Sequence, residues 1–134
     1  MEYQERRVQR VFSLKFSDGD RMIECVEKLA KEKGIHLGFV IFLGGFSKAE
    51  LVLGLRKYSK VPGDFDRISF SETHEVVGAG SILWVDGQPK VHFHAGVAKE
   101  REVFIAHIEE ADVVGAEAFI LELGGDGFGS AALV

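Results

Sequence analysis

The chain has 134 residues, 46% of them hydrophobic and 28% charged, and its formal net charge is −5. This size and composition are typical of one folded domain, which we expect to span residues 1–134. No run approaches about eighteen uncharged apolar residues, which excludes a membrane-spanning helix. The negative charge disfavours a nucleic-acid binder, because such proteins use a basic surface to neutralise phosphates.

The first residues indicate where the protein resides. "MEYQERRVQR" lacks the apolar core of a secretory signal. Cys25 is the one cysteine, so an internal disulfide is ruled out, and we interpret it as a small apolar residue of a reducing compartment. We therefore expect a cytoplasmic protein. Arg6, Arg7 and Arg10 form a short basic cluster, which we interpret as the solvated edge of a strand.

The first predicted elements are a strand and a helix. In "RVFSLKFS", Phe12, Leu14 and Phe16 alternate with Val11, Ser13 and Lys15, which is the period-two pattern of a half-buried strand. Residues 18–33 then change to helical spacing, with an apolar face, a cap at Asp18 and Gly34 after the end. The predicted apolar face consists of Met22, Val26, Leu29 and Ala30.

Strands follow along the rest of the chain. "HLGFVIFLGG" and "FSKAELVLGLRKY" are predicted as two strands, with a loop around Pro62, Gly63 and Asp64. One or two strands are expected over 70–85, and Asp86-Gly87 predicts a hairpin turn. "AEAFILEL" is the last predicted strand, before the glycine-rich "GGDGFGS". We expect an α+β domain with a largely antiparallel, curved sheet of six or seven strands and one main helix packed on it.

Three histidines stand close together in "VHFHAGVAKEREVFIAHI". His92 and His94 would project from the same face of a strand, about 7 Å apart at the backbone. His107 could return over them from either a helical turn or an extended strand. Three neutral nitrogen donors with an open position are typical of a catalytic zinc site, although nickel, iron or cobalt also accept such ligands. The alternative is that each ring bonds a backbone carbonyl in a polar patch.

Other polar groups are assigned no site. His36 follows the helix-ending glycine and is interpreted as a structural or surface residue, and His74 as a strand residue. The glycines of "LGGDGFGS" lack the lysine of a phosphate-binding loop and indicate a turn or close packing. A carboxylate near the metal would support enzyme chemistry, but spacing places none of the candidates at the histidines. These candidates are Glu72, Glu75 and Asp126.

The histidine segment also resembles a known signature. "GAGSILWVDGQPKVHFHAGVAKEREVFIAHI" is similar to the pattern of the plant and prokaryote conserved (PPC) domain family, and "GIHLGFVIFLGGFSKAELVLG" resembles the preceding part of the domain. The chain departs from the family at Ile105 and Ala106, where a glycine pair is usual. The matching positions are Gly44, Gly45, Gly87, Pro89, His92, His94 and His107.

The resemblance implies a homotrimer with an antiparallel sheet flanked by helices, and a DNA-associated or regulatory role. The AT-hook that reads DNA in plant members is absent here, so DNA binding is implied only weakly. The family fold also resembles that of α-acetolactate decarboxylase, whose zinc is held by a similar histidine set. The alternative function is therefore a metal-dependent lyase or hydrolase acting on a small carbonyl compound, and whether the chain is an enzyme stays open.

Overall fold

The computed structural model describes residues 1–55 and 65–124 of the chain. Within these residues it contains one helix and six strands, all in one antiparallel sheet, which confirms the α+β prediction. The same residues hold no helix of the length and apolarity that a membrane crossing needs. The elements are β1 (Val8–Lys15), α1 (Met22–Lys33), β2 (Gly38–Leu55), β3 (Phe65–Phe70), β4 (His74–Val85), β5 (Gln88–Lys99) and β6 (Glu102–Leu123).

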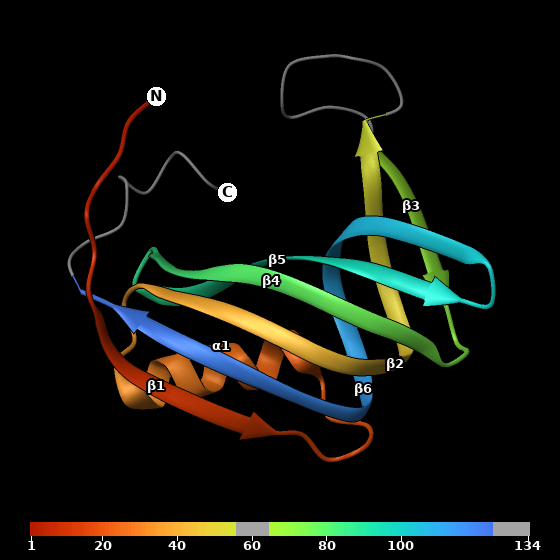
Figure 1. The fold of residues 1–134 in the computed structure, drawn as a ribbon, viewed down its shortest axis with the longest axis horizontal. Helices are drawn as coiled ribbons and strands as arrows, with labels where there is room; N and C mark the ends of the chain where they lie inside the picture. The colour runs from red at the N-terminus through yellow and green to blue at the C-terminus, as the bar shows by residue number, and fades with distance from the viewer. Residues whose placement is uncertain (56–64, 125–134) are drawn as a thin grey trace.

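The sheet curls because two of its strands are long and bent. The strand order is β1-β6-β5-β4-β2-β3, and β6 pairs with β2 as well. The second half of β6 lies between β1 and β2, whereas its first half lies between β5 and β2 (Figure 1). β2 and β6 therefore run through both ends of the sheet and connect them.

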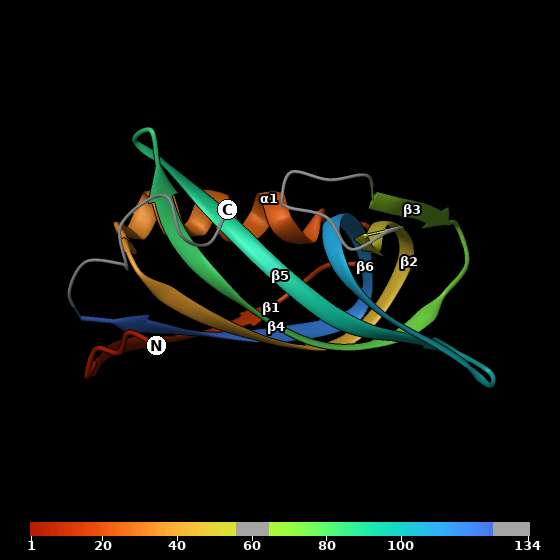
Figure 2. The same cartoon turned by 90° about the horizontal axis from the view of Figure 1, so that it is seen from above.

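Helix α1 packs on one face of the curled sheet, as Figure 2 shows. Its buried residues include Met22, Val26 and Ala30, three of the four that the helical spacing predicts, while Leu29 is partly buried. They meet the fully buried rings of Phe42 and Phe93 in one apolar cluster. Full burial of a valine, methionine or phenylalanine side chain contributes roughly 1.5–3 kcal/mol, so this layer supplies much of the stability of the domain.

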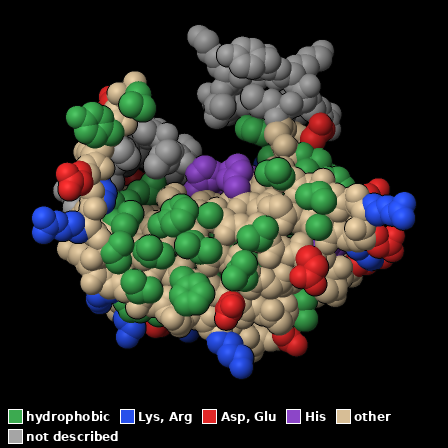
Figure 3. Space-filling model, in the orientation of Figure 1, with side chains coloured by type: hydrophobic (Ala, Val, Ile, Leu, Met, Phe, Trp, Pro, Cys, Tyr) green, Lys and Arg blue, Asp and Glu red, His purple; other side chains and the backbone are tan. Residues whose placement is uncertain are grey.

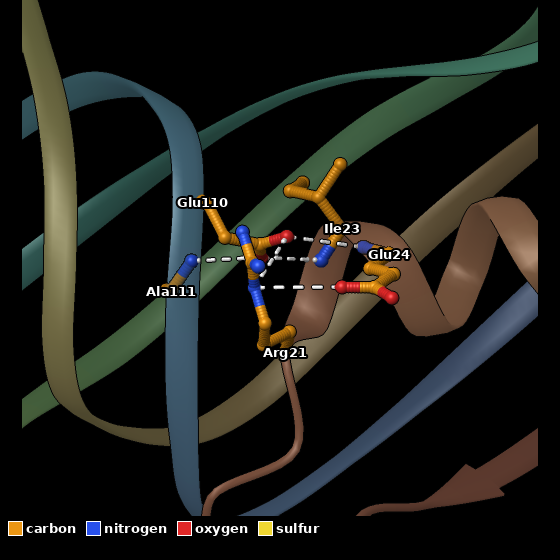
Figure 4. Close-up of polar contacts among 5 residues, drawn as sticks. All are labelled: Arg21, Ile23, Glu24, Glu110 and Ala111. Atoms are coloured by element: carbon orange, nitrogen blue, oxygen red, sulfur yellow. Dashed lines mark hydrogen bonds and ion pairs between the residues drawn. The ribbon is translucent and has the colours of Figure 1, made fainter.

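The predicted start of the helix is wrong by one turn. The helix begins at Met22, and Asp18 does not cap it; an Asp18 oxygen accepts the Gly115 N–H at 2.9 Å instead. The N-cap residue Arg21 makes no capping bond with its side chain. Figure 4 shows that the cap comes from Glu110 on β6, whose carboxylate accepts N–H groups of the first turn. The predicted end is confirmed, since Gly34 is the left-handed C-cap.

Residues 38–55 form one continuous strand, β2, where two strands were predicted. The chain bends at Gly44 instead of turning. Its φ of 145° is rarely adopted by other residues, and an added Cβ would lie 2.5 Å from the Ala116 Cα. Glycine therefore permits both the bend and the close approach to β6.

The predicted hairpin turn between β4 and β5 is confirmed. Asp86 and Gly87 both have positive φ, 50° and 74°, and Val85 pairs with Gln88 across the turn. The last strand, β6, is much longer than predicted and includes His107, which settles that this residue lies on an extended strand. The loop around Pro62-Gly63-Asp64 and the glycine-rich tail beyond Gly124 lie outside the described residues.

Candidate metal centre

The structure brings together the three histidines that the sequence singled out. His92 and His94 lie on β5, and His107 lies on β6 directly opposite His94 in the antiparallel register. Opposite residues of an antiparallel pair project from the same face, so all three rings meet on one side of the sheet. Among the residues that the structure describes, these three form the one group of histidine, cysteine or acidic side chains arranged to hold a metal ion.

The local sequence holds the histidine pair in place. Phe93 points away from the histidines and is fully buried, which anchors β5 in the core. Its ring lies over Gly78 and Gly80 of β4, where an added Cβ would come within 3 Å of the Phe93 ring. The residues opposite the histidines are small: Ala79 faces His94 and Ser81 faces His92. Strand β4 therefore has glycines on its core face, where they leave room for Phe93, and small side chains on the face of the histidines.

The histidine nitrogens are close enough to share one ion. The Nε2 atoms of His92 and His94 are 3.0 Å apart, and one ligand nitrogen from each of the three rings lies within 4.8 Å of the others. In a tetrahedral site with metal–nitrogen bonds of about 2.0–2.1 Å, two ligand nitrogens are about 3.4 Å apart. A small side-chain rotation would therefore bring all three to bonding distance, and the donor set fits a divalent transition metal.

The electrostatics of the cluster favour neutral imidazoles, which are the form that binds metals. Burial lowers the pKa of His94 below its ordinary value of 6.5, and repulsion from a charged His92 lowers it further. Burial is also the main cause of the lowered pKa of His107, to which His92 and His94 add. At neutral pH His94 and His107 therefore present unprotonated ring nitrogens to a metal ion.

A pocket of about 350 Å³ opens beside the three histidines. Two charged residues line it together with the rings: Arg67 from β3 and Glu109 from β6, whose side chains form an ion pair. The sequence prediction missed both. Glu109 could have been found, because it stands two residues after His107 and shares its face on a strand. Arg67 gave no signal, since only the pairing of β3 with β2 brings it near.

The remaining lining of the pocket is largely apolar. Leu53 from β2, Phe65 from β3 and Ile105 from β6 contribute to it. Ile105 is 76% exposed, which is unusual for isoleucine in a strand. Because Ile105 and Glu109 stand two residues before and after His107, the apolar and charged parts of the pocket lie on either side of that ring along β6.

The other residues considered in the sequence lie apart from this site. His36 is exposed and stacks on Trp84, with ring centroids 4.5 Å apart. His74 opens β4, is buried, and bonds the Glu72 carbonyl through Nδ1 at 2.8 Å. The Glu72 side chain pairs with Lys99, and Glu75 is exposed on β4. Asp126 lies outside the described residues.

Of the N-terminal arginines, Arg10 lies on the edge strand β1, as predicted, and Arg6 and Arg7 directly precede that strand. Two of them are engaged within the molecule. Arg10 bonds both carboxylate oxygens of the buried Glu122 and the Lys33 carbonyl. Arg6 donates to the Gly124 carbonyl at 3.0 Å. These guanidinium groups therefore stabilise the chain ends.

The sheet face opposite α1 carries exposed apolar side chains, with the histidines at its rim (Figure 3). One row of directly paired residues runs from His94 through Ala79 and Ile41 to Phe119. Large apolar side chains exposed on this face include Val11, Phe39, Ile41, Leu43, Val77 and Phe119. A contiguous apolar face of this kind marks an interaction surface in many soluble proteins.

Comparisons with known proteins agree with this architecture. The model of the Plants and Prokaryotes Conserved (PCC) domain matches residues 3–124. A metal-containing protein from Archaeoglobus fulgidus is similar in structure, with a TM-score of 0.83 and 26% identity over 95% of this chain and 89% of that one. No curated protein matches the sequence.

Two further solved structures show the same fold at lower identity. A plant- and prokaryote-conserved protein from Pyrococcus horikoshii has a TM-score of 0.79 and 22% identity, covering 94% of this chain and 87% of that one. A proposed DNA-binding protein from Bacteroides thetaiotaomicron has a TM-score of 0.68 and 21% identity, covering 87% and 82%.

Proposed function

The chain belongs to the Plants and Prokaryotes Conserved domain family, and from this premise we propose that it binds a divalent metal ion, zinc in the first place, through His92, His94 and His107. The observation that carries the proposal is the convergence of the three ring nitrogens to within 4.8 Å. The lowered pKa values of His94 and His107 support it, because they keep these ligands unprotonated at neutral pH. The metal content of the similar Archaeoglobus protein supports it further.

Zinc is proposed because neutral imidazoles in a tetrahedral arrangement are among its preferred ligands. Nickel, iron and cobalt accept the same donors, so the ion taken up in the cell depends also on metal supply. Three protein ligands would leave a coordination position for a further ligand, and the pocket beside the histidines offers room for one. A divalent cation bound there would act as a Lewis acid toward a ligand in that pocket.

The direct test is metal analysis of the chain purified without a polyhistidine tag. We expect about one metal ion per chain, lost in the double variant His92→Ala/His94→Ala. His36→Ala is the matched control, because it removes an exposed histidine outside the cluster. Equal metal content in the double variant and the control would refute the proposal.

We also propose that copies of the chain associate through the apolar face shown in Figure 3. The resemblance to the family implies that the assembly is a homotrimer. The supporting observation is the row of large apolar side chains that lies exposed on one sheet face. A second copy is the proposed occupant because edge strands and apolar faces favour self-association. Ile41→Asp should then shift the mass measured by light scattering toward one chain, whereas Lys28→Glu on the exposed side of α1 should not.

A metal-dependent lyase or hydrolase is the second candidate function, favoured by the pocket that adjoins the histidines. Its volume suits a small molecule, and its charged pair could orient a polar substrate. A screen of small 2-oxo and acetohydroxy acids, with metal-loaded and metal-free protein, tests this candidate. Absence of metal-dependent turnover would count against it.

DNA association ranks below metal binding. The similar Bacteroides protein is a proposed DNA binder, but at 21% identity this likeness concerns the fold alone. The chain has a net charge of −5, and Arg6 and Arg10 are engaged in internal bonds. Duplex binding that weakens steeply with salt would support this function.

A further inference from the structure

The pocket beside the histidines combines a row of directly paired residues with an exposed apolar wall. Arg67 pairs with Val52, Val52 pairs with His107, and His107 pairs with His94, so these side chains share one face of four neighbouring strands. Arg67 therefore lies on the same surface as the histidine cluster, separated from His107 by one strand. A ligand in the pocket would contact both the cation site and the guanidinium side of the pocket.

The charge balance of this pocket favours an anion. The three histidines are neutral ligands, so a bound divalent cation would keep its full charge toward the pocket. Glu109 offsets Arg67 by pairing with its Nη1 atom. A guanidinium carries five N–H donors, and the Arg67 side chain is 61% exposed, so it can still turn donors toward a ligand. Because Arg67 and Glu109 offset each other, the charge of the cation remains, and a negative group on the ligand would offset part of it.

The opposite side of the pocket selects an apolar group. Ile105 is 76% exposed and Leu53 is 37% exposed, and both line the pocket. Covering them with a hydrocarbon chain removes apolar surface from water on both partners. The volume of about 350 Å³ is at the low end of the range for ligand pockets, which suits a small organic acid better than a nucleotide.

We propose that this pocket binds a small monocarboxylate with a short aliphatic chain, its carboxylate toward the cation and Arg67 and its chain over Ile105 and Leu53. The inference rests on the proposed metal function. It adds the chemical class of the ligand and the residues that select it: Arg67 and Glu109 set the preference for negative charge, and Ile105 sets the preference for chain length.

The test uses the full chain loaded with Co²⁺, whose visible spectrum reports changes at the metal, together with calorimetry. Butanoate is the probe, acetate is the short-chain comparison, and butanamide is the neutral one. We expect butanoate to change the spectrum saturably and to bind about five- to tenfold tighter than acetate, because two further methylenes are partly buried. Butanamide should leave the spectrum unchanged at the same concentration.

Three variants separate the contributions. Arg67→Gln should weaken butanoate binding about two- to fivefold, and Glu109→Gln should strengthen it by a similar factor, because it removes a negative charge and frees Arg67. Ile105→Ser should keep acetate binding but bring the ratio of butanoate to acetate affinity close to one. Arg101→Gln, at the exposed turn between β5 and β6, is the matched control and should behave like the parent chain.

The outcomes distinguish this inference from the metal proposal. A chain that takes up no Co²⁺ overturns both. A chain that takes up Co²⁺ but shows neither a spectral change nor heat with butanoate overturns the carboxylate inference alone. Equal binding of butanamide and butanoate would also overturn it, as would tighter butanoate binding by Arg67→Gln or weaker butanoate binding by Glu109→Gln.

Discussion

The side chain of Glu110 on β6 accepts the backbone N–H of Ile23, in the first turn of α1, at 2.9 Å. Its second oxygen accepts the Glu24 N–H at 3.2 Å, and the first also accepts the N–H of Ala111 (Figure 4). A carboxylate at this position satisfies donors that an isolated helix leaves unpaired, and it interacts favourably with the positive end of the helix dipole. The start of α1 is therefore fixed by a strand residue far away in the sequence.

Replacing Glu110 by alanine should destabilise the protein by about 1–2 kcal/mol, the usual cost of losing a helix N-cap. Urea unfolding followed by circular dichroism measures the loss. Glu117→Ala is the control, because Glu117 is an exposed acid of the same strand. If both variants lose equally little, the carboxylate of Glu110 does not cap the helix in solution.

This cap explains why the sequence predicted the body of α1 but not its beginning. The apolar spacing of Met22, Val26 and Ala30 is a local pattern, and all three are buried as expected. The local signal for the start of the helix is Asp18, whereas the capping oxygens come from Glu110 on β6. Tertiary contacts of this kind leave no trace in a short window of sequence.

The residues of the candidate site also divide into those that local sequence predicts and those that depend on strand pairing. His92 and His94 were predictable as a pair, because alternation along a strand puts them on one face. The position of His107 opposite His94 depends on the register of the β5–β6 hairpin, which the sequence left open between two conformations. Arg67 reaches the pocket only through two strand pairings, from β3 to β2 and from β2 to β6. Local patterns therefore found the ligands but not the charged pair beside them.

Gly80 is predicted to be essential for the geometry of the histidine pair. A Cβ at this position would lie 2.9 Å from the Phe93 Cα, in the backbone that joins His92 and His94. Gly80→Ala should therefore push β4 away from β5, cost about 1–3 kcal/mol of stability and lower the metal content of the folded protein. Thermal unfolding and metal analysis of the same samples measure the two effects.

Gly96 on β5 provides the control for that experiment. An added Cβ there meets its nearest atom, the Val77 carbonyl oxygen, at 3.9 Å, which is ordinary contact. Gly96→Ala should keep both stability and metal content close to those of the parent chain. A Gly80→Ala protein as stable and as metal-loaded as Gly96→Ala would show that β4 and β5 tolerate separation here.

The pair of Arg10 and Glu122 should make stability sensitive to acid. Bonding to Arg10 lowers the pKa of Glu122 below its ordinary value of 4.5, against the opposing effect of burial. A carboxyl group with a lowered pKa in the folded state stabilises the fold above its unfolded value and loses that contribution as the pH falls. Arg10→Met should therefore destabilise the protein at pH 7, and the difference from the parent chain should shrink below about pH 4.5.

Arg7→Met, an exposed neighbour, is the control for the acid experiment, with urea midpoints measured from pH 3 to pH 7. The midpoint of this variant should follow that of the parent chain at every pH. A constant difference between Arg10→Met and the parent over the whole range would mean that the ion pair does not perturb the ionisation of Glu122.

Metal binding should stabilise the fold and should depend on pH in a defined direction. A metal that binds only the folded chain stabilises it by about 2.7 kcal/mol at a free concentration of one hundred times Kd, so chelation should lower the unfolding temperature. Because the pKa values of His94 and His107 are lowered, the affinity should resist acidification better than that of a site built from ordinary imidazoles. It should fall as the pH drops through the lowered values, where protons compete for the nitrogens.

In the metal-free protein, the same histidines should make the stability of the fold sensitive to acid. Below pH 6.5 the unfolded chain takes up protons on these rings while the folded chain resists them, so acidification destabilises the fold. His94→Gln/His107→Gln should remove this part of the acid sensitivity, and His36→Ala should not. Unfolding curves from pH 5 to pH 8, with and without metal, measure both effects. If the metal-free double variant keeps the parent's acid response, the folded chain does not hold the imidazoles of His94 and His107 neutral.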